Sequence, residues 1–174
     1  MAVDSKGTVY FTDSGPFGGT TLASPKGSVF CISPDGRLLQ PLALSCLAHP
    51  AGLAVSPDEK AVYVCETMAN RVLRFVQKPA GVFHFSVFHQ FSGGLGPSGV
   101  TCDKSGNGYV GRMDFASGDG EDASQGMVSV LSPGGKLLSE TECPASEISG
   151  LVVSGDSVYV SEASTNTVFK MAAV

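Results

Sequence analysis

Short apolar runs, separated by turn residues, recur along this chain. The stretch PAGLAVSPDEKAVYVCETMANRVLRF, residues 50–75, holds three such runs, and the turn Pro57-Asp58 separates the first two. Proline presets φ for a tight turn and aspartate can bond its own backbone, whereas valine-rich and tyrosine-rich runs favour strands. The stretch therefore predicts a strand, a turn, a strand, a loop and a third strand.

The same unit recurs from Met1, from Pro97 and from Ile148. Leu53, Val100 and Leu151 hold equivalent places, so the repeat lengths are 47 (100 − 53) and 51 (151 − 100) residues. Repeats of about 40–50 residues with about four strands each are typical of a β-propeller. No segment sustains a 3.6-residue apolar period, so almost no helix is expected. The prediction is an all-β protein with one propeller domain over residues 1–174.

The pattern accounts for about four blades. They begin near residues 1, 51, 98 and 148, the last has only three evident strands, and the polar segment 117–125 is expected to be a loop. Closed propellers usually have more blades, and an open set exposes apolar sheet faces. We therefore expect this chain to be part of a larger propeller, or a protein partner to cover its open blades.

The amino-acid composition limits which binding partners and which cellular compartment are expected for this protein. The net charge of −5 argues against nucleic acid and anionic membranes, and no apolar run reaches the length that spans a bilayer. The five cysteines include no CxxC pair, so no cysteine zinc site is expected, and several lie in apolar runs as buried thiols. With no secretory pattern at Met1, these features indicate a reducing, cytoplasmic location.

Four motifs in order carry a family resemblance. The chain resembles the SMP-30/gluconolactonase/LRE-like superfamily in the motifs GTVYFTDSG, PKGSVFCISPDG, HPAGLAVSPDEKAVYVCETMANRVLRF and PSGVTCDKSGNGYVGRMDF, taken together. Within that superfamily their sequence is most similar to the strictosidine-synthase-like branch. The resemblance covers the whole chain and matches the last four blades of a six-bladed propeller. It implies about two further blades before Met1, and hydrolysis of lactones or related esters.

The resemblance also implies a site at one mouth of the central channel. Lactonases of the superfamily hold one divalent metal, commonly calcium or zinc, through a first-blade glutamate, an asparagine before glycine and an aspartate before glycine. The asparagine position is Ala51 and the aspartate position is Ser98, so neither matches. The glutamate and a substrate-binding asparagine would lie before Met1, and the glutamate of the strictosidine-synthase type corresponds to about Ser149. Alanine offers no ligand atom and serine is a poor substitute for a carboxylate, so a degenerate metal site is expected, with Ser98 and Glu66 as the remaining ligand candidates.

One polar position closes each second strand in register. Asp13, Glu66, Arg112 and Glu162 occupy it, and strands of a propeller bring such ends to one mouth. One interpretation makes Glu66 and Glu162 the metal-binding or proton-handling groups, with Arg112 stabilising an anionic intermediate. The other is that these side chains bond loop amides and neighbouring blades, as buried-rim polar groups usually do.

Three further residues are candidates for substrate binding at the same mouth: Asp13, His49 and Ser149. His49 is also the one plausible general base, because His84 and His89 fall on an outer strand. The functional hypothesis is a lactone or ester hydrolase acting on a small molecule at the channel mouth. The alternatives are a non-catalytic propeller that binds a small molecule or a protein there, and a structural subunit whose open edges dock in an assembly.

Overall fold

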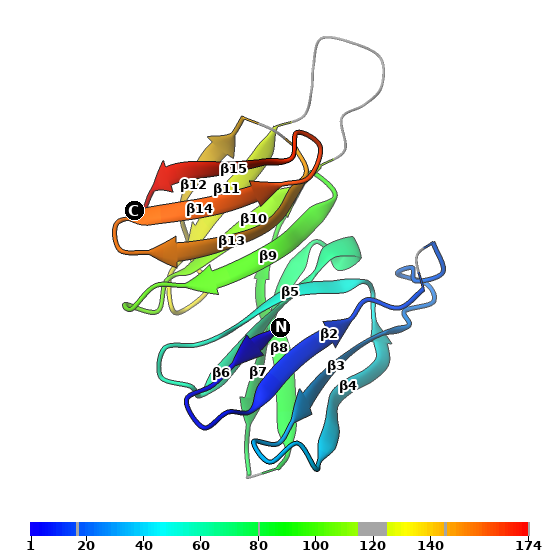
Figure 1. The fold of residues 1–174 in the computed structure, drawn as a ribbon. Coiled ribbons are helices and arrows are strands. Elements are labelled where there is room, and N and C mark those ends of the chain that lie inside the picture. Colours follow the sequence, from blue (N-terminus) through cyan, green and yellow to red (C-terminus); the bar gives the residue numbers. More distant parts are fainter. Residues whose placement is uncertain (17, 80, 115–124, 145, 174) are drawn as a thin grey trace.

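The computed structural model describes residues 1–16, 18–79, 81–114, 125–144 and 146–173, which form strands joined by turns (Figure 1). Within these residues the one helical element is a single 3-10 turn, η1, at Thr67–Ala69. The all-β prediction is therefore confirmed. No helix in the described part of the chain is long and apolar enough to cross a membrane.

The strands form four antiparallel sheets, one after another along the chain. The first sheet holds β1 (Ala2–Val3), β2 (Val9–Asp13), β3 (Gly27–Ile32) and β4 (Leu39–Leu47). The second holds β5 (Pro50–Val55), β6 (Ala61–Glu66), β7 (Arg71–Gln77) and β8 (Phe83–Gln90). The third holds β9 (Gly96–Cys102), β10 (Gly108–Met113), β11 (Gly126–Leu131) and β12 (Leu137–Cys143). The fourth holds β13 (Ile148–Ser154), β14 (Ser157–Glu162) and β15 (Thr167–Ala172).

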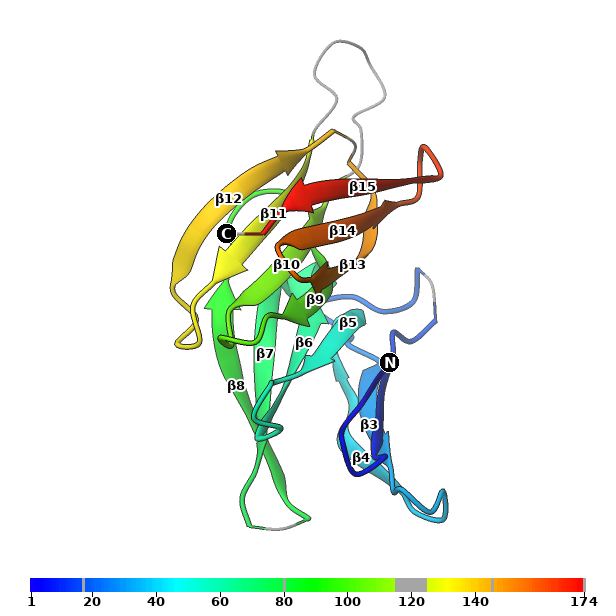
Figure 2. The same ribbon diagram turned by 60° about the vertical axis from the view of Figure 1, so that its left-hand side comes forward.

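Each sheet is a blade whose strands follow chain order, and β5, β9 and β13 pack beside one another at successive blade junctions. The four-blade propeller arrangement is thus confirmed, and the last sheet has the three strands that the sequence indicated. Figure 2 shows the blades of β1–β4 and β13–β15 at the two ends of the series. The strand β4 runs from Leu39 to Leu47, and the predicted loop at 117–125 lies, apart from Gln125, outside the described residues.

The turn chemistry explains why the inner strands end where they do. After β5, the Ser56 hydroxyl donates to the Asp58 carboxylate (2.7 Å) and accepts the Ala61 amide (2.9 Å). After β9, Asp103 accepts the amides of Ser105 and Asn107. Short polar side chains thus bond the backbone that the sheet ladder leaves unpaired, which is why aspartate and serine mark these turns.

The hydrophobic core consists of three clusters, and each lies where two consecutive blades meet. Val29 and Leu42 of the first blade pack with Leu53 and Phe75 of the second. Equivalent clusters join the second blade to the third and the third to the fourth. Burial is therefore strongest between blades, and the continuous apolar run of β6 is buried along its whole length.

Glycines set how closely the first strands approach. A Cβ built on Gly52 would lie 2.6 Å from Gly99 Cα and 2.7 Å from the Ser98 carbonyl oxygen, both on the neighbouring blade. A Cβ on Gly99 would lie 2.8 Å from a methyl carbon of Leu151. At Gly52 the neighbouring backbone occupies the place of a side chain, and at Gly99 the Leu151 methyl leaves too little room for one.

Candidate functional site

The first strands of the last three blades begin at one end of the blades, where their second strands end. Strand pairing sets Pro50 opposite Glu66 and Ile148 opposite Glu162, and Pro97 opposite Arg112. Ala51, Ser98 and Ser149, each one residue further along a first strand, therefore lie at the same end as these polar residues. This end is the right-hand side of the blades in Figure 1.

Glu66 is almost fully buried at this end, with 2% of its surface exposed. One carboxylate oxygen accepts the backbone amide of Ala48 (2.7 Å), and the other accepts Nε of Arg71 (2.7 Å). Ala48 belongs to the segment that crosses from the first blade into the second. Glu66 thus fastens the entry of its own blade, and both oxygens have a partner.

Glu162 fastens the entry of the fourth blade in the same way. One oxygen accepts the amide of Glu147 (2.9 Å), which lies in the segment entering that blade, and the hydroxyl of Ser164 (2.6 Å). The other oxygen accepts the amide (2.7 Å) and hydroxyl (2.6 Å) of Thr165. Burial acts to raise the pKa of Glu162, but these hydrogen bonds favour the charged form more strongly and hold it at about 2.

Arg112 reverses the polarity of the same contact in the third blade. Its guanidinium donates to the carbonyls of Ser92 (2.9 Å) and Gly93 (3.1 Å), in the segment that enters this blade. It also pairs with Glu140 (2.8 Å) and lies over the Phe91 ring, 4.7 Å from its centroid. In three of the four blades the polar register therefore forms an entry clamp, in which an acid binds amides or a base binds carbonyls, and Asp13 of the first blade does not take part.

The metal-ligand candidates do not form a metal site. Ala51 has no donor atom, and the Ser98 hydroxyl contacts the carbonyls of Ile148 and Gly111 (3.2 Å). Both oxygens of Glu66 are engaged as described. No cluster of three or more histidine, cysteine, aspartate or glutamate side chains that could hold a metal ion occurs among the residues whose placement is described. The residues present do not fit a hard divalent cation, which takes six or more oxygen ligands.

The Ser98 contact has a structural explanation. Ser14 and Thr67 follow β2 and β6, and their hydroxyls donate to the carbonyls of Pro50 (2.7 Å) and Pro97 (2.7 Å), near the start of the next blades. Met113 occupies that place in the third blade and has no hydroxyl. The equivalent carbonyl, that of Ile148, accepts Ser98 instead. Ser98 therefore completes the blade junction that Met113 leaves without a donor.

The three substrate-binding candidates are less engaged. Asp13 is exposed, and among the described residues its carboxylate accepts only the amide of Gly15 (2.9 Å). Ser149 is exposed and its hydroxyl lies 3.0 Å from that of Ser161. His49 is half-buried, with a φ of 59°, and its ring makes no hydrogen bond to any described residue. Histidine adopts this left-handed backbone more readily than most residues other than glycine.

All seven candidates lie at this end of the blades, and their functional roles stay predictions. The second interpretation, that these side chains bond loop amides, describes Glu66 and Glu162, whose partners include the amides of Ala48 and Glu147. Sequence reasoning did not identify Arg71 as the other partner of Glu66.

The sequence repeat reveals which position of each blade is polar. It does not reveal the bonding partner of that side chain, because the partner lies in a different segment of the chain and shows no recurring residue type. The hydroxyls of Ser14 and Thr67 could have been found, because both come one residue after the register position.

Comparison with known proteins identifies the class. The profile of the SMP-30/Gluconolactonase/LRE-like region matches residues 1–164. The chain therefore belongs to this family of β-propeller proteins. The strictosidine-synthase-like branch and the place of these blades among six stay predictions.

Two curated relatives carry the same name. Lactonase drp35 of Staphylococcus haemolyticus (strain JCSC1435) is 35% identical over 153 residues, which is 81% of this chain and 44% of that protein. Lactonase drp35 of Staphylococcus aureus (strain USA300) is 38% identical over 114 residues, 63% of this chain and 34% of that protein. The chain thus spans less than half the length of these relatives.

Solved structures agree on the fold. XC5397 from Xanthomonas campestris, described as a gluconolactonase, superposes with a TM-score of 0.68 at 27% identity, over 92% of this chain and 52% of that one. Regucalcin from Agrobacterium tumefaciens, described as a calcium-binding protein, superposes with a TM-score of 0.74 at 20% identity, over 94% of this chain and 52% of that one. The second likeness concerns the fold alone.

Proposed function

We propose that this protein hydrolyses small lactones at the end of the blades where β5, β9 and β13 begin. The observation that carries the proposal is the 35% identity to a lactonase across 81% of the chain. The fold adds support, because the family profile extends over residues 1–164 and therefore into all four blades.

His49 is the group we assign to the chemistry. Its ring has no hydrogen bond among the described residues, and it precedes Ala51 at the blade ends. In contrast, both carboxylate oxygens of Glu66 and of Glu162 and both terminal nitrogens of Arg112 already have partners. A free imidazole is the better candidate for a general base.

The proton transfers of the reaction can be assigned to this residue. The imidazole of His49 takes a proton from water as the water oxygen adds to the lactone carbonyl carbon. The tetrahedral intermediate collapses, the ring C–O bond breaks, and the imidazolium returns the proton to the leaving alkoxide. The product is a hydroxy acid. Asp13 and Ser149 are assigned to binding the polar groups of the substrate, since both are exposed.

Acid release measured in a pH-stat with δ-gluconolactone tests this proposal. His49→Asn removes the base but keeps a residue that tolerates the left-handed backbone, so the fold should persist. His84→Asn is the matched control, because His84 is exposed on the outer strand β8 and contacts the carbonyl of Lys78 (2.9 Å). We expect His49→Asn to lose about 100-fold or more in kcat and His84→Asn to match the wild type.

The two parts of the proposal fail separately. A wild type that opens no lactone above the buffer rate would refute hydrolysis and favour the non-catalytic binding propeller. If the His49→Asn variant is as active as the wild type, His49 is not the general base, but the protein is still a lactone hydrolase.

A further inference from the structure

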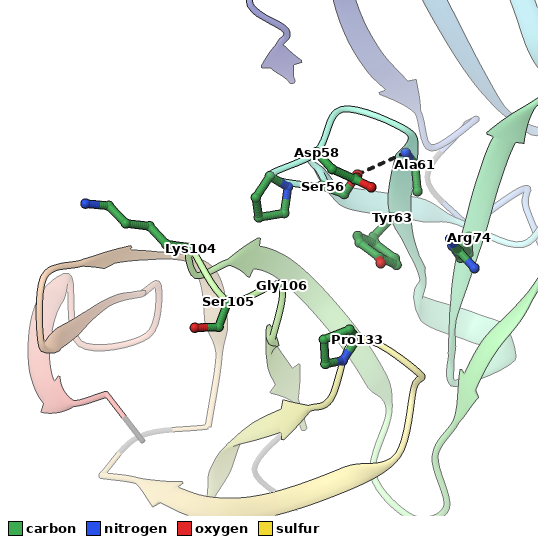
Figure 3. A pocket seen from close by; sticks show the side chains of 10 residues that line it. Ser56, Asp58, Ala61, Tyr63, Arg74, Lys104, Ser105, Gly106 and Pro133 are labelled. Carbon is green, nitrogen blue, oxygen red and sulfur yellow. Dashed lines mark hydrogen bonds between the residues drawn. The ribbon is translucent and has the colours of Figure 1, made fainter.

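A cavity of about 260 Å³ lies between the second and third blades, at the opposite end from His49 and Ala51 (Figure 3). Its walls come from the turn after β5, the turn after β9 and the turn between β11 and β12. Strands rise about 3.3 Å per residue, so Ser56 at this cavity is roughly 16 Å from Ala51 along β5. The cavity is therefore separate from the proposed lactone site.

Tyr63 and Arg74 form one wall as cross-strand partners of β6 and β7. The Tyr63 side chain is buried, with 5% of the residue exposed, and its ring packs against Phe88 with 4.6 Å between centroids. Its hydroxyl has no hydrogen-bond partner among the described residues and does not belong to the buried unpaired atoms, so it is open to the solvent of the cavity. Burial raises the pKa of Tyr63, so the phenol stays protonated and can donate at neutral pH.

Arg74 is exposed on β7, so water solvates its guanidinium and a ligand in the cavity can reach it. Its guanidinium makes no ion pair or hydrogen bond with any residue in the described ranges, although the chain as a whole carries a net charge of −5. Figure 3 shows Tyr63 and Arg74 next to each other on adjacent strands, while the side chain of Lys104 extends away from both. A cation without a counter-ion thus stands beside a hydroxyl that has a proton to donate.

The acidic group at this cavity is already engaged. Asp58 accepts the Ser56 hydroxyl (2.7 Å) and the Lys60 amide (3.2 Å), and its other oxygen lies 3.7 Å from the Lys60 ammonium. Lys60 therefore offsets the charge of Asp58, and the charge of Arg74 is left to attract an anion. The remaining walls include Ala61 and the proline rings of Pro57 and Pro133, which offer apolar surface.

We propose that this cavity binds a small organic carboxylate with an apolar body. A guanidinium fits a carboxylate with two parallel hydrogen bonds, and the Tyr63 hydroxyl supplies a third donor. The apolar part of the ligand packs against the proline rings. Ligand pockets usually measure about 300–1,000 Å³, so a cavity of this size suits a single ring or a short chain.

Calorimetric titration of the whole protein with benzoate tests the proposal, with benzamide as the uncharged ligand of nearly the same shape. Benzoate should bind at least about tenfold more tightly than benzamide, because the charge-assisted bonds to Arg74 are lost with the amide. Inorganic phosphate, which lacks the apolar ring, should bind at least about tenfold more weakly than benzoate.

Variants of the wall locate the binding. Arg74→Gln should weaken benzoate binding about tenfold or more, and Tyr63→Phe, which keeps the ring, about fivefold. Arg37→Gln is the matched control, since it removes the same charge from an exposed turn of the first blade and should leave binding unchanged. Equal binding of benzoate and benzamide, phosphate binding as tight as benzoate, or equal effects of Arg74→Gln and Arg37→Gln would each overturn the proposal.

Discussion

Replacing Glu66 with glutamine separates a structural clamp from a catalytic carboxylate. Glutamine can still accept the amide of Ala48, but it loses the charge and can turn an NH₂ group toward Nε of Arg71, where two donors would face each other. Breaking a buried ion pair typically costs about 3–5 kcal/mol. The Arg71 side chain is 32% exposed and can regain water, so the loss should be near the lower end, about 3 kcal/mol.

Urea unfolding followed by far-UV circular dichroism measures this loss directly. For a chain of this size, about 3 kcal/mol corresponds to a melting temperature roughly 6–12 °C lower. Glu142→Gln is the control, because Glu142 is exposed on β12 and should change stability by less than about 0.5 kcal/mol. Adding Arg71→Gln to Glu66→Gln should cost little more, since the pair is already broken. A Glu66→Gln protein with wild-type stability but no lactone hydrolysis would refute the clamp and restore Glu66 as a catalytic candidate.

Three further predictions concern packing, pH and thiol reactivity. Gly52→Ala places a Cβ 2.6 Å from the Gly99 backbone and should lower the free energy of unfolding by about 1–3 kcal/mol. Gly108→Ala is the control, because a Cβ there has no atom within 4 Å and should not lower it. Equal melting curves for the two variants would contradict the close contact between the blades. The pKa of Glu162 in the folded protein, about 2, lies below its usual 4.5, so its contribution to stability is present above pH 4.5 and is lost as the pH falls toward 2. In Glu162→Gln the melting temperature should therefore change less with pH between 4.5 and 2 than in the wild type. The same pH dependence in both proteins would count against this role. Burial raises the pKa of the Cys65 thiol, so alkylation of the native protein followed by mass spectrometry should label exposed Cys46 well before Cys65, and the reverse order would show that the second blade opens.

Much of the fold could be predicted because each blade repeats its own signals. The run Ala61–Cys65 between Pro57-Asp58 and a polar loop indicates a buried strand, and the structure has one there. The recurrence of that unit predicted four blades, and the sheets follow it. Strand ends were less certain, as at β4, because a register shift lets its ladder continue to Leu47.

The site was harder to predict because repetition marks positions and not their partners. Asp13, Glu66, Arg112 and Glu162 are in register, and a propeller does bring such positions to one end. What the register could not reveal is that the side chains of Glu66, Arg112 and Glu162 turn to the segments entering their own blades. The role of Ser98 depended in turn on Met113, a residue with no polar atom to draw attention in the sequence.

The apolar faces at the two ends of the blade series bear on the predicted partner. Val152 is 53% exposed and Val168 66% exposed on the last blade, and Val3 is 58% exposed on the first. A protein that covers these faces stays a prediction, which light scattering at micromolar concentration tests by the presence or absence of association.

We expect this protein to hydrolyse lactones through residues of these blades, without metal ligands at Ala51 and Ser98. The most direct test is the rate of δ-gluconolactone hydrolysis by the wild type in three conditions: untreated, treated with a chelator, and treated with calcium or zinc then added back. The account predicts the same rate in all three conditions, and a rate that falls about 100-fold in His49→Asn. Activity that disappears on chelation and returns with the metal would contradict it.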